Sequence, residues 1–199
     1  MNERETKNLV AEAKEYVVQA IRGVGDVAGA IVDATSNALI HALKGTRATG
    51  SELRTLVADT ITGTIQGVAQ VGGEVESAAS SIMVGALRGA KQVGKTGIEA
   101  VSATAAALVK ETAEVGGDVG LTARSAVEGA IKGARDVGMT AEQAASAAAS
   151  GAMIGAGEIS NSALDQVRNV VTKTISGVKV VITEPFRSNE AQRPQQRAG

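Results

Sequence analysis

Uncharged side chains recur along this chain every eleven residues. Counted in elevens from Val71, one uncharged line extends from Tyr16 to Val181, and two more lines follow it at successive offsets of four residues. Separations of four, four and three residues place side chains on one face of a helix, whereas strand positions alternate every two residues. The pattern therefore predicts an all-α protein whose repeat region covers residues 16–183.

The larger aliphatic side chains follow a neighbouring line, and most Lys and Arg residues fall on other lines. The predicted helix is therefore amphipathic, with a wide apolar face and a polar stripe. Eleven residues in three turns is about 3.67 residues per turn, so packed neighbours supercoil weakly and right-handedly. Because the register never slips and Pro is absent from residues 1 to 184, the simplest prediction is one long helix, on the order of 250 Å, in a helical bundle or coiled-coil-like oligomer.

The chain also repeats itself at longer range. Residues 71–94 and 115–138 are identical at 12 of 24 positions, at an offset of 44 residues, or four elevens. Val-Gly opens each 22-residue half, and two capping-box patterns follow, Thr96-Gly-Ile-Glu99 and Thr140-Ala-Glu-Gln143. These features also suit stacked helical hairpins with helices of about 20 residues. The continuous helix is preferred because a turn is expected to shift the register and because short helices rich in Gly, Val and Thr have poor propensity.

Glycine is frequent for a helical region, with 24 residues in the chain. Each interior Gly costs a helix about 0.8–1 kcal/mol relative to Ala, so a compensating contact is expected. Several glycines form i, i+4 pairs, and small residues at that spacing let two helix backbones approach closely. The alternative is that glycine keeps a lipid-facing or solvent-facing helix pliable. The predicted helix-contact seam consists of Gly63, Gly67, Gly85, Gly89, Gly129, Gly133, Gly151 and Gly155.

The two ends of the chain differ from the repeat region. Residues 1–15 are highly charged and are interpreted as the solvated start of a helix. Pro185 ends the helical region, and residues 184–199 are polar and are interpreted as a flexible tail. Phe186 in this tail is a candidate anchor for a partner or for lipid, and the alternative is a solvent-exposed tail residue.

Composition argues against an ordinary globular core. The chain has one Phe, one Tyr and no Trp, and its 44% hydrophobic content is mostly Ala and Val. A formal net charge of −1 gives no electrostatic reason to bind nucleic acid. The charged N-terminus lacks the apolar core of a signal peptide, and no window is apolar enough to suggest a membrane span. We therefore expect a cytoplasmic protein, at most peripheral to a membrane or granule.

Motifs that carry chemistry are few. Residues 89–96 match the G-x-x-x-x-G-K-[ST] pattern of phosphate-binding loops, but Met139 stands in the sister repeat where Lys95 stands here, so the match is interpreted as a by-product of the repeat. His41 is the single His and there is no Cys, which argues against a zinc site and against a Ser-His-Asp arrangement. We therefore expect no enzyme activity, no cofactor and no metal.

In pattern, residues 16–183 resemble the repeats of group 3 late-embryogenesis-abundant proteins, the synucleins and the perilipins. Residues 67–75, Gly-Val-Ala-Gln-Val-Gly-Gly-Glu-Val, are synuclein-like. The chain lacks the Lys-Thr-Lys-Glu-type core that synuclein repeats usually carry, and it has less charge than late-embryogenesis proteins. The resemblance implies an amphipathic helix that can be disordered alone and ordered on lipid.

Two functions fit these observations. The first is a non-enzymatic scaffold that forms a homo-oligomer through the Ala/Gly/Val face of its helices, with a client protein reached through the tail. The second is a peripheral coat or stress-protection protein whose apolar face lies on a membrane, droplet or granule. An assembly with an apolar lining also suits a lipidic ligand.

Overall fold

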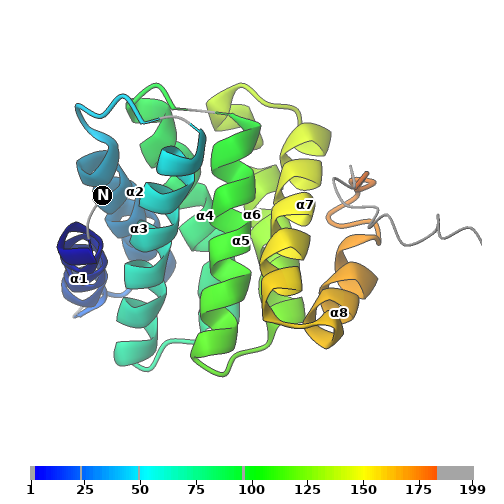
Figure 1. Cartoon of the computed structure of the whole chain (residues 1–199), viewed down its shortest axis with the longest axis horizontal. Helices are drawn as coiled ribbons and strands as arrows, with labels where there is room; N and C mark the ends of the chain where they lie inside the picture. Colours follow the sequence, from blue (N-terminus) through cyan, green and yellow to red (C-terminus); the bar gives the residue numbers. More distant parts are fainter. Residues whose placement is uncertain (1–2, 23, 49, 96, 183–199) are drawn as a thin grey trace, which may run out of the picture.

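The described part of the chain folds into eight α-helices, which confirms the predicted all-α class. The structure is a computed structural model that describes residues 3–22, 24–48, 50–95 and 97–182. The prediction of one continuous helix is wrong, and stacked short helices are the arrangement present (Figure 1). The helices are α1 (Glu3–Ile21), α2 (Val27–Leu43), α3 (Gly50–Gln70), α4 (Val75–Gln92), α5 (Ile98–Glu114), α6 (Val119–Ala134), α7 (Ala141–Ile159) and α8 (Asn161–Val171), with a 3₁₀ turn η1 (Arg135–Val137) after α6.

Four glycines spaced 22 residues apart end the central helices. Gly72, Gly94, Gly116 and Gly138 have positive φ angles of 76°, 69°, 78° and 74°, a left-handed conformation that costs other residues roughly 1–2 kcal/mol. At the end of α5, the Gly116 N–H donates to the Ala113 carbonyl at 3.1 Å and the next N–H donates to the Thr112 carbonyl at 2.8 Å. The same pair of bonds recurs at the other three glycines. This is the Schellman arrangement, which satisfies the last carbonyl groups of a helix.

The turns from Gly72 to Gly138 do not shift the eleven-residue register, because these four turn glycines lie 22 residues apart, or two elevens. Each turn therefore returns the next helix to the same phase. An uninterrupted pattern of apolar positions is compatible with a regular series of turns, and only the glycine at the left-handed position distinguishes the two arrangements.

The helices form two layers. In each layer a helix packs on the helix two places further along the chain, α1 on α3 and α3 on α5 in one layer, α2 on α4 and α4 on α6 in the other. Figure 1 shows α3, α5 and α7 side by side in front, with α8 at the far end from α1. The core lies between the layers, where Ile61, Ile65, Ile82 and Leu108 are fully buried.

Polar side chains cap several helix N-termini. Asp118 accepts hydrogen bonds from the N–H groups of Gly120 and Leu121 at the start of α6. The predicted capping box is present at the start of α7, where Thr140 and Gln143 each accept from the other's backbone N–H. Thr96 of the other predicted box lies outside the described residues. These caps satisfy N–H groups that have no partner within their own helix.

The described ends of the chain are helix α1 and the segment that follows α8. Helix α1 runs without interruption across the boundary expected between residues 15 and 16. After α8, a single antiparallel bridge joins Ile175 and Val178. The expected tail, residues 184–199, and the candidate anchor Phe186 lie outside the described residues.

Gly116→Ala is expected to lower the free energy of unfolding by roughly 1–2 kcal/mol, because Ala must adopt the left-handed conformation at the end of α5. Gly157→Ala is the matched control, since Gly157 is helical in α7 and an added Cβ meets nothing within 4 Å. There the same substitution is expected to gain up to about 1 kcal/mol of helix propensity. Urea titrations measure both. Equal gains in the two variants would contradict the turn at Gly116.

Candidate functional site

All eight glycines of the predicted seam are buried, and all lie against other helices of the same chain. The pair on α3 faces α1, the pair on α4 faces α2, the pair on α6 faces α4, and the pair on α7 faces α5. A Cβ added at Gly129 would lie 2.5 Å from the Ser80 carbonyl oxygen, and one at Gly85 would lie 2.5 Å from the Val32 carbonyl oxygen. The backbones of neighbouring helices therefore meet where a side chain is absent.

One contact departs from this pattern. In the 22-residue series of glycine pairs, the α5 positions are occupied by Ala107 and Glu111. Helix α5 therefore packs on α3 without the paired glycines, and a carboxylate occupies the second position. Asp59 of α3 lies close enough to Glu111 to influence its ionisation. These acids belong to no motif in the sequence, although the gap in the glycine series at positions 107 and 111 is visible there.

Both carboxylic acids are harder to ionise than usual. Burial raises the pKa of Asp59, against a hydrogen bond with Thr6 that lowers it. One carboxylate oxygen of Asp59, Oδ2, is buried without a hydrogen-bond partner. Burial also raises the pKa of Glu111; a hydrogen bond with Thr62 lowers it, and the charges of neighbouring acids raise it further. Burial therefore makes both carboxylic acids, which lie near each other where α3 packs on α5, ionise less readily than in water.

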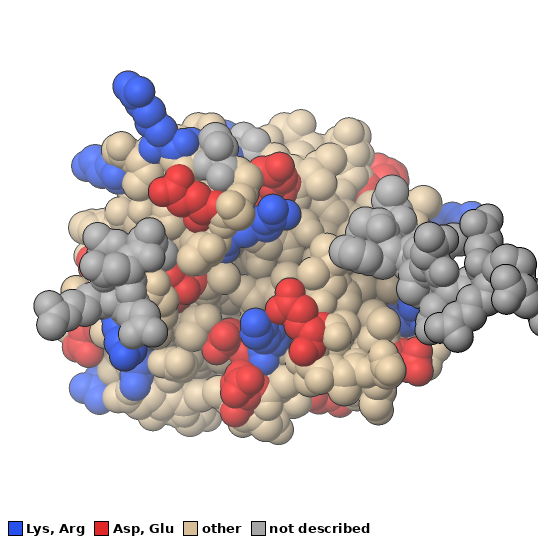
Figure 2. Space-filling view, in the orientation of Figure 1, with Lys and Arg blue, Asp and Glu red and all other residues tan. Residues whose placement is uncertain are grey.

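Basic side chains stand beside this contact. Lys110, next to Glu111, lowers the pKa of that acid and pairs with Glu158 of α7, with Nζ 3.1 Å from Oε2. Figure 2 shows acidic and basic side chains interspersed on the face that it presents. The pair of Lys110 and Glu158 is about half exposed on each side, so it adds little to stability.

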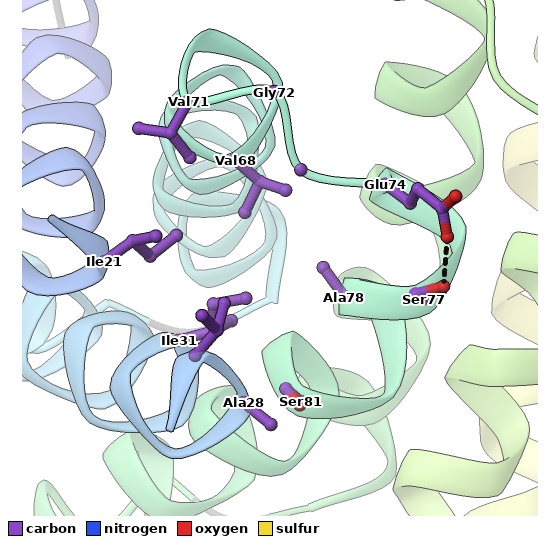
Figure 3. A pocket seen from close by; sticks show the side chains of 12 residues that line it. Ile21, Ala28, Ile31, Val68, Val71, Gly72, Glu74, Ser77, Ala78 and Ser81 are labelled. Carbon is purple, nitrogen blue, oxygen red and sulfur yellow. Dashed lines mark hydrogen bonds between the residues drawn. The ribbon is translucent and has the colours of Figure 1, made fainter. Parts of the chain in front are cut away.

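An apolar hollow opens where α1 and α3 end and α2 and α4 begin (Figure 3). We call it the aliphatic pocket. Its volume is about 400 Å³, and its interior is formed by Ile21, Ile31, Val68, Val71 and Ala78. Polar groups stand at its edge on α4, where the Ser77 hydroxyl donates to Glu74 Oε2 at 3.0 Å. The pocket can take an apolar group of modest size and offers one carboxylate beside it.

A shallower groove of about 520 Å³ lies along α5 and α7 and is bordered by residue Val181, from the segment that follows α8. Ile98 and Val181 there are 59% and 60% exposed. The Val181 N–H donates to Ser146 Oγ of α7 at 3.3 Å, which ties this segment to the groove. Exposed aliphatic side chains gathered in one place are a common feature of interaction surfaces.

The residues that match a phosphate-binding loop have the wrong local structure for one. Residues 89–92 form the C-terminal end of α4, and the chain then turns at Gly94. Lys95 Nζ donates to the Ala48 carbonyl oxygen at 2.8 Å. A phosphate-binding loop uses the N–H groups at a helix N-terminus, whereas this end of α4 exposes carbonyl oxygens.

His41 lies beside two side chains of helix α1. Its Nδ1 lies 3.5 Å from Glu12 Oε1, and its ring lies 5.7 Å from that of Tyr16. The ring therefore lies in the contact between α1 and α2. Within the described residues, no three His, Cys, Asp or Glu side chains are grouped so that they could hold a metal ion.

Comparisons with models of protein families, with curated proteins and with solved structures found no match to this chain.

Gly129→Ala is expected to destabilise the fold, because the new methyl group would press against the Ser80 carbonyl oxygen and lie 2.9 Å from Met83 Cβ. Overpacking typically costs ~1–3 kcal/mol, which exceeds the roughly 1 kcal/mol that Ala gains in helix propensity. Urea titration measures the difference, with Gly157→Ala again as the matched control. A gain in both variants would show that α6 does not approach α4 this closely.

The double variant Asp59→Asn with Glu111→Gln is expected to be more stable than the parent at about pH 7, and this gain should shrink as the pH falls towards about 4. Because the folded pKa of each acid lies above its unfolded value, the unfolded state ionises first as the pH rises. The ionised acids therefore reduce the free energy of unfolding above this range and leave it unchanged below it.

Denaturant midpoints across this pH range measure the effect. Asp33→Asn is the control, since Asp33 is exposed on α2. An equal gain at both ends of the range, or a loss at neutral pH, would contradict the burial of the two acids.

Proposed function

We propose that this chain is a non-enzymatic scaffold protein whose folded helical stack associates with further copies of itself. The observation that carries the proposal is the regular close packing of its helices at paired glycines. Backbones in direct contact form a closely packed interior that resists deformation. A stiff body of this kind suits a role in which the protein holds other components in position.

The surface that we propose for self-association differs from the one expected from the sequence. The Ala/Gly/Val face of the helices is buried between the helices of one chain. In the folded protein, copies therefore have to meet through residues that remain exposed. Ile98, Ile154 and Val181 along the α5–α7 groove are the group that best fits, since apolar side chains clustered on a surface favour contact with another protein.

A peripheral lipid-surface function is the alternative, because the same exposed aliphatic side chains suit contact with a lipid surface. No helix within the described residues combines the length and apolar character needed to cross a bilayer. The amphipathic helix implied by the resemblance would need the stack to open, since its long apolar lines are buried here. The main proposal keeps three further expectations: a cytoplasmic location, a client protein reached through the tail, and no enzyme activity.

The double variant Ile98→Ser with Ile154→Ser tests this proposal. We expect the parent to self-associate with rising concentration in sedimentation velocity, and the variant to raise the dissociation constant by roughly tenfold or more, as expected when central apolar contacts are removed. Leu121→Ser is the matched control, because Leu121 is 54% exposed but lies on α6. The control should associate like the parent.

A parent that stays monomeric at every concentration would overturn the scaffold proposal. Circular dichroism with and without vesicles distinguishes the scaffold from the lipid-surface alternative. A protein that is helical without lipid supports the folded scaffold. One that gains most of its helix only on vesicles supports the lipid-surface function.

A further inference from the structure

The counterpart of the aliphatic pocket one repeat further along is closed by a side-chain bridge that the pocket itself lacks. At the next step of the stack, Glu76 Oε1 accepts the Asp118 N–H at 2.7 Å. A Cβ added at Gly117 there would lie 2.6 Å from the same Glu76 oxygen. Val32 occupies the position 44 residues before Glu76, and its side chain has no acceptor that could make such a bridge. The step of the stack that contains the pocket therefore lacks a side chain equivalent to Glu76, which bridges the next step.

The pocket lining is also more apolar than its counterpart. Val68 and Ala78 line the pocket, and the residues 44 positions later are Thr112 and Thr122. Both hydroxyl groups are buried without a hydrogen-bond partner. The closed step contains the buried hydroxyl groups of Thr112 and Thr122, whereas the aliphatic pocket has methyl groups in their place. A water molecule in the open step would find few partners for its hydrogen bonds, because a buried water needs two to four polar neighbours.

We propose that the aliphatic pocket binds the hydrocarbon chain of a small single-chain amphiphile with a cationic head group. The volume of about 400 Å³ lies near the lower end of the ~300–1,000 Å³ of small-molecule sites, which suits one chain rather than the two chains of a phospholipid. Burial of that chain against the aliphatic side chains supplies most of the affinity, at about 25 cal/mol per Å² of apolar surface.

The edge of the pocket selects the charge of the head group. Glu74 is the single charged residue among the twelve that line the pocket, and it is exposed to solvent. Figure 3 shows its side chain directed away from the aliphatic interior and towards Ser77. A cation held at the mouth can therefore approach this carboxylate while the hydrocarbon chain lies inside, and an anionic head group meets repulsion.

Calorimetric titration of the full chain with dodecyltrimethylammonium, below its micelle concentration, tests the proposal. We expect saturable binding of one molecule per chain. Ala28→Leu, which adds carbon at the pocket from α2, should weaken binding by roughly tenfold or more. Ala11→Leu is the matched control on an exposed position of α1, and it should bind like the parent. Circular dichroism checks that each variant is folded.

Further outcomes decide the assignment. Glu74→Gln should weaken binding of dodecyltrimethylammonium and leave binding of uncharged dodecyl maltoside unchanged. Equal affinity of the parent for dodecyl sulfate would overturn the cationic selectivity, and unaltered binding by Ala28→Leu would overturn the site. Non-saturable uptake with loss of helix would overturn the proposal as plain detergent denaturation. Sedimentation of Ala28→Leu should match the parent, so this site and the proposed self-association can fail separately.

Discussion

Direct contact between helix backbones, made possible by paired glycines, is the interaction on which this stack depends. The chain has one Phe, one Tyr and no Trp, and much of the core of α7 consists of Ala residues. Such small side chains fill only a narrow gap, and dispersion attraction falls steeply once a gap opens. The helices therefore have to approach until the carbonyl oxygens of one lie against the glycines of the next. The helix propensity lost at each glycine is offset by this contact.

The sequence predicts the all-α class, because the helical spacing of apolar positions depends only on helix geometry. It does not predict where the helices end by the same means. Successive turn glycines from Gly72 to Gly138 lie 22 residues apart, so the phase after each of these turns is the phase of an unbroken helix. The information lies instead in single glycines such as Gly116, whose left-handed backbone is visible only in three dimensions. The glycines of the seam could be identified from the sequence, but the helices that they contact could not, since a helix of another copy or of the same chain satisfies the spacing.

The candidate sites were harder to find because they are exceptions to the repeat. Glu111 occupies a glycine position, and a sequence pattern treats one charge on an apolar line as a tolerated interruption. Its significance comes from Asp59, which is 52 positions away in the chain and is brought close by the packing of α3 on α5. The aliphatic pocket likewise depends on the difference between Val32 and Glu76. That difference gains meaning only when the hydrogen bond from Asp118 to Glu76 is seen.

Asp59 and part of the lining of the aliphatic pocket both belong to α3. Asp59, near the middle of α3, opposes the packing of this helix when it ionises, because it is partly buried beside Thr6 of α1 and influences Glu111 of α5. Val68 and Val71, at the end of the same helix, line the pocket shared with α1. A stack stabilised by neighbour contacts opens most readily at its weakest step. A ligand that binds the folded form adds stability in proportion to the logarithm of its concentration. Occupation of the pocket therefore stabilises the same helix that the ionised acids destabilise. Helix α3 is thus an element through which pH and a bound ligand can both act on the whole stack.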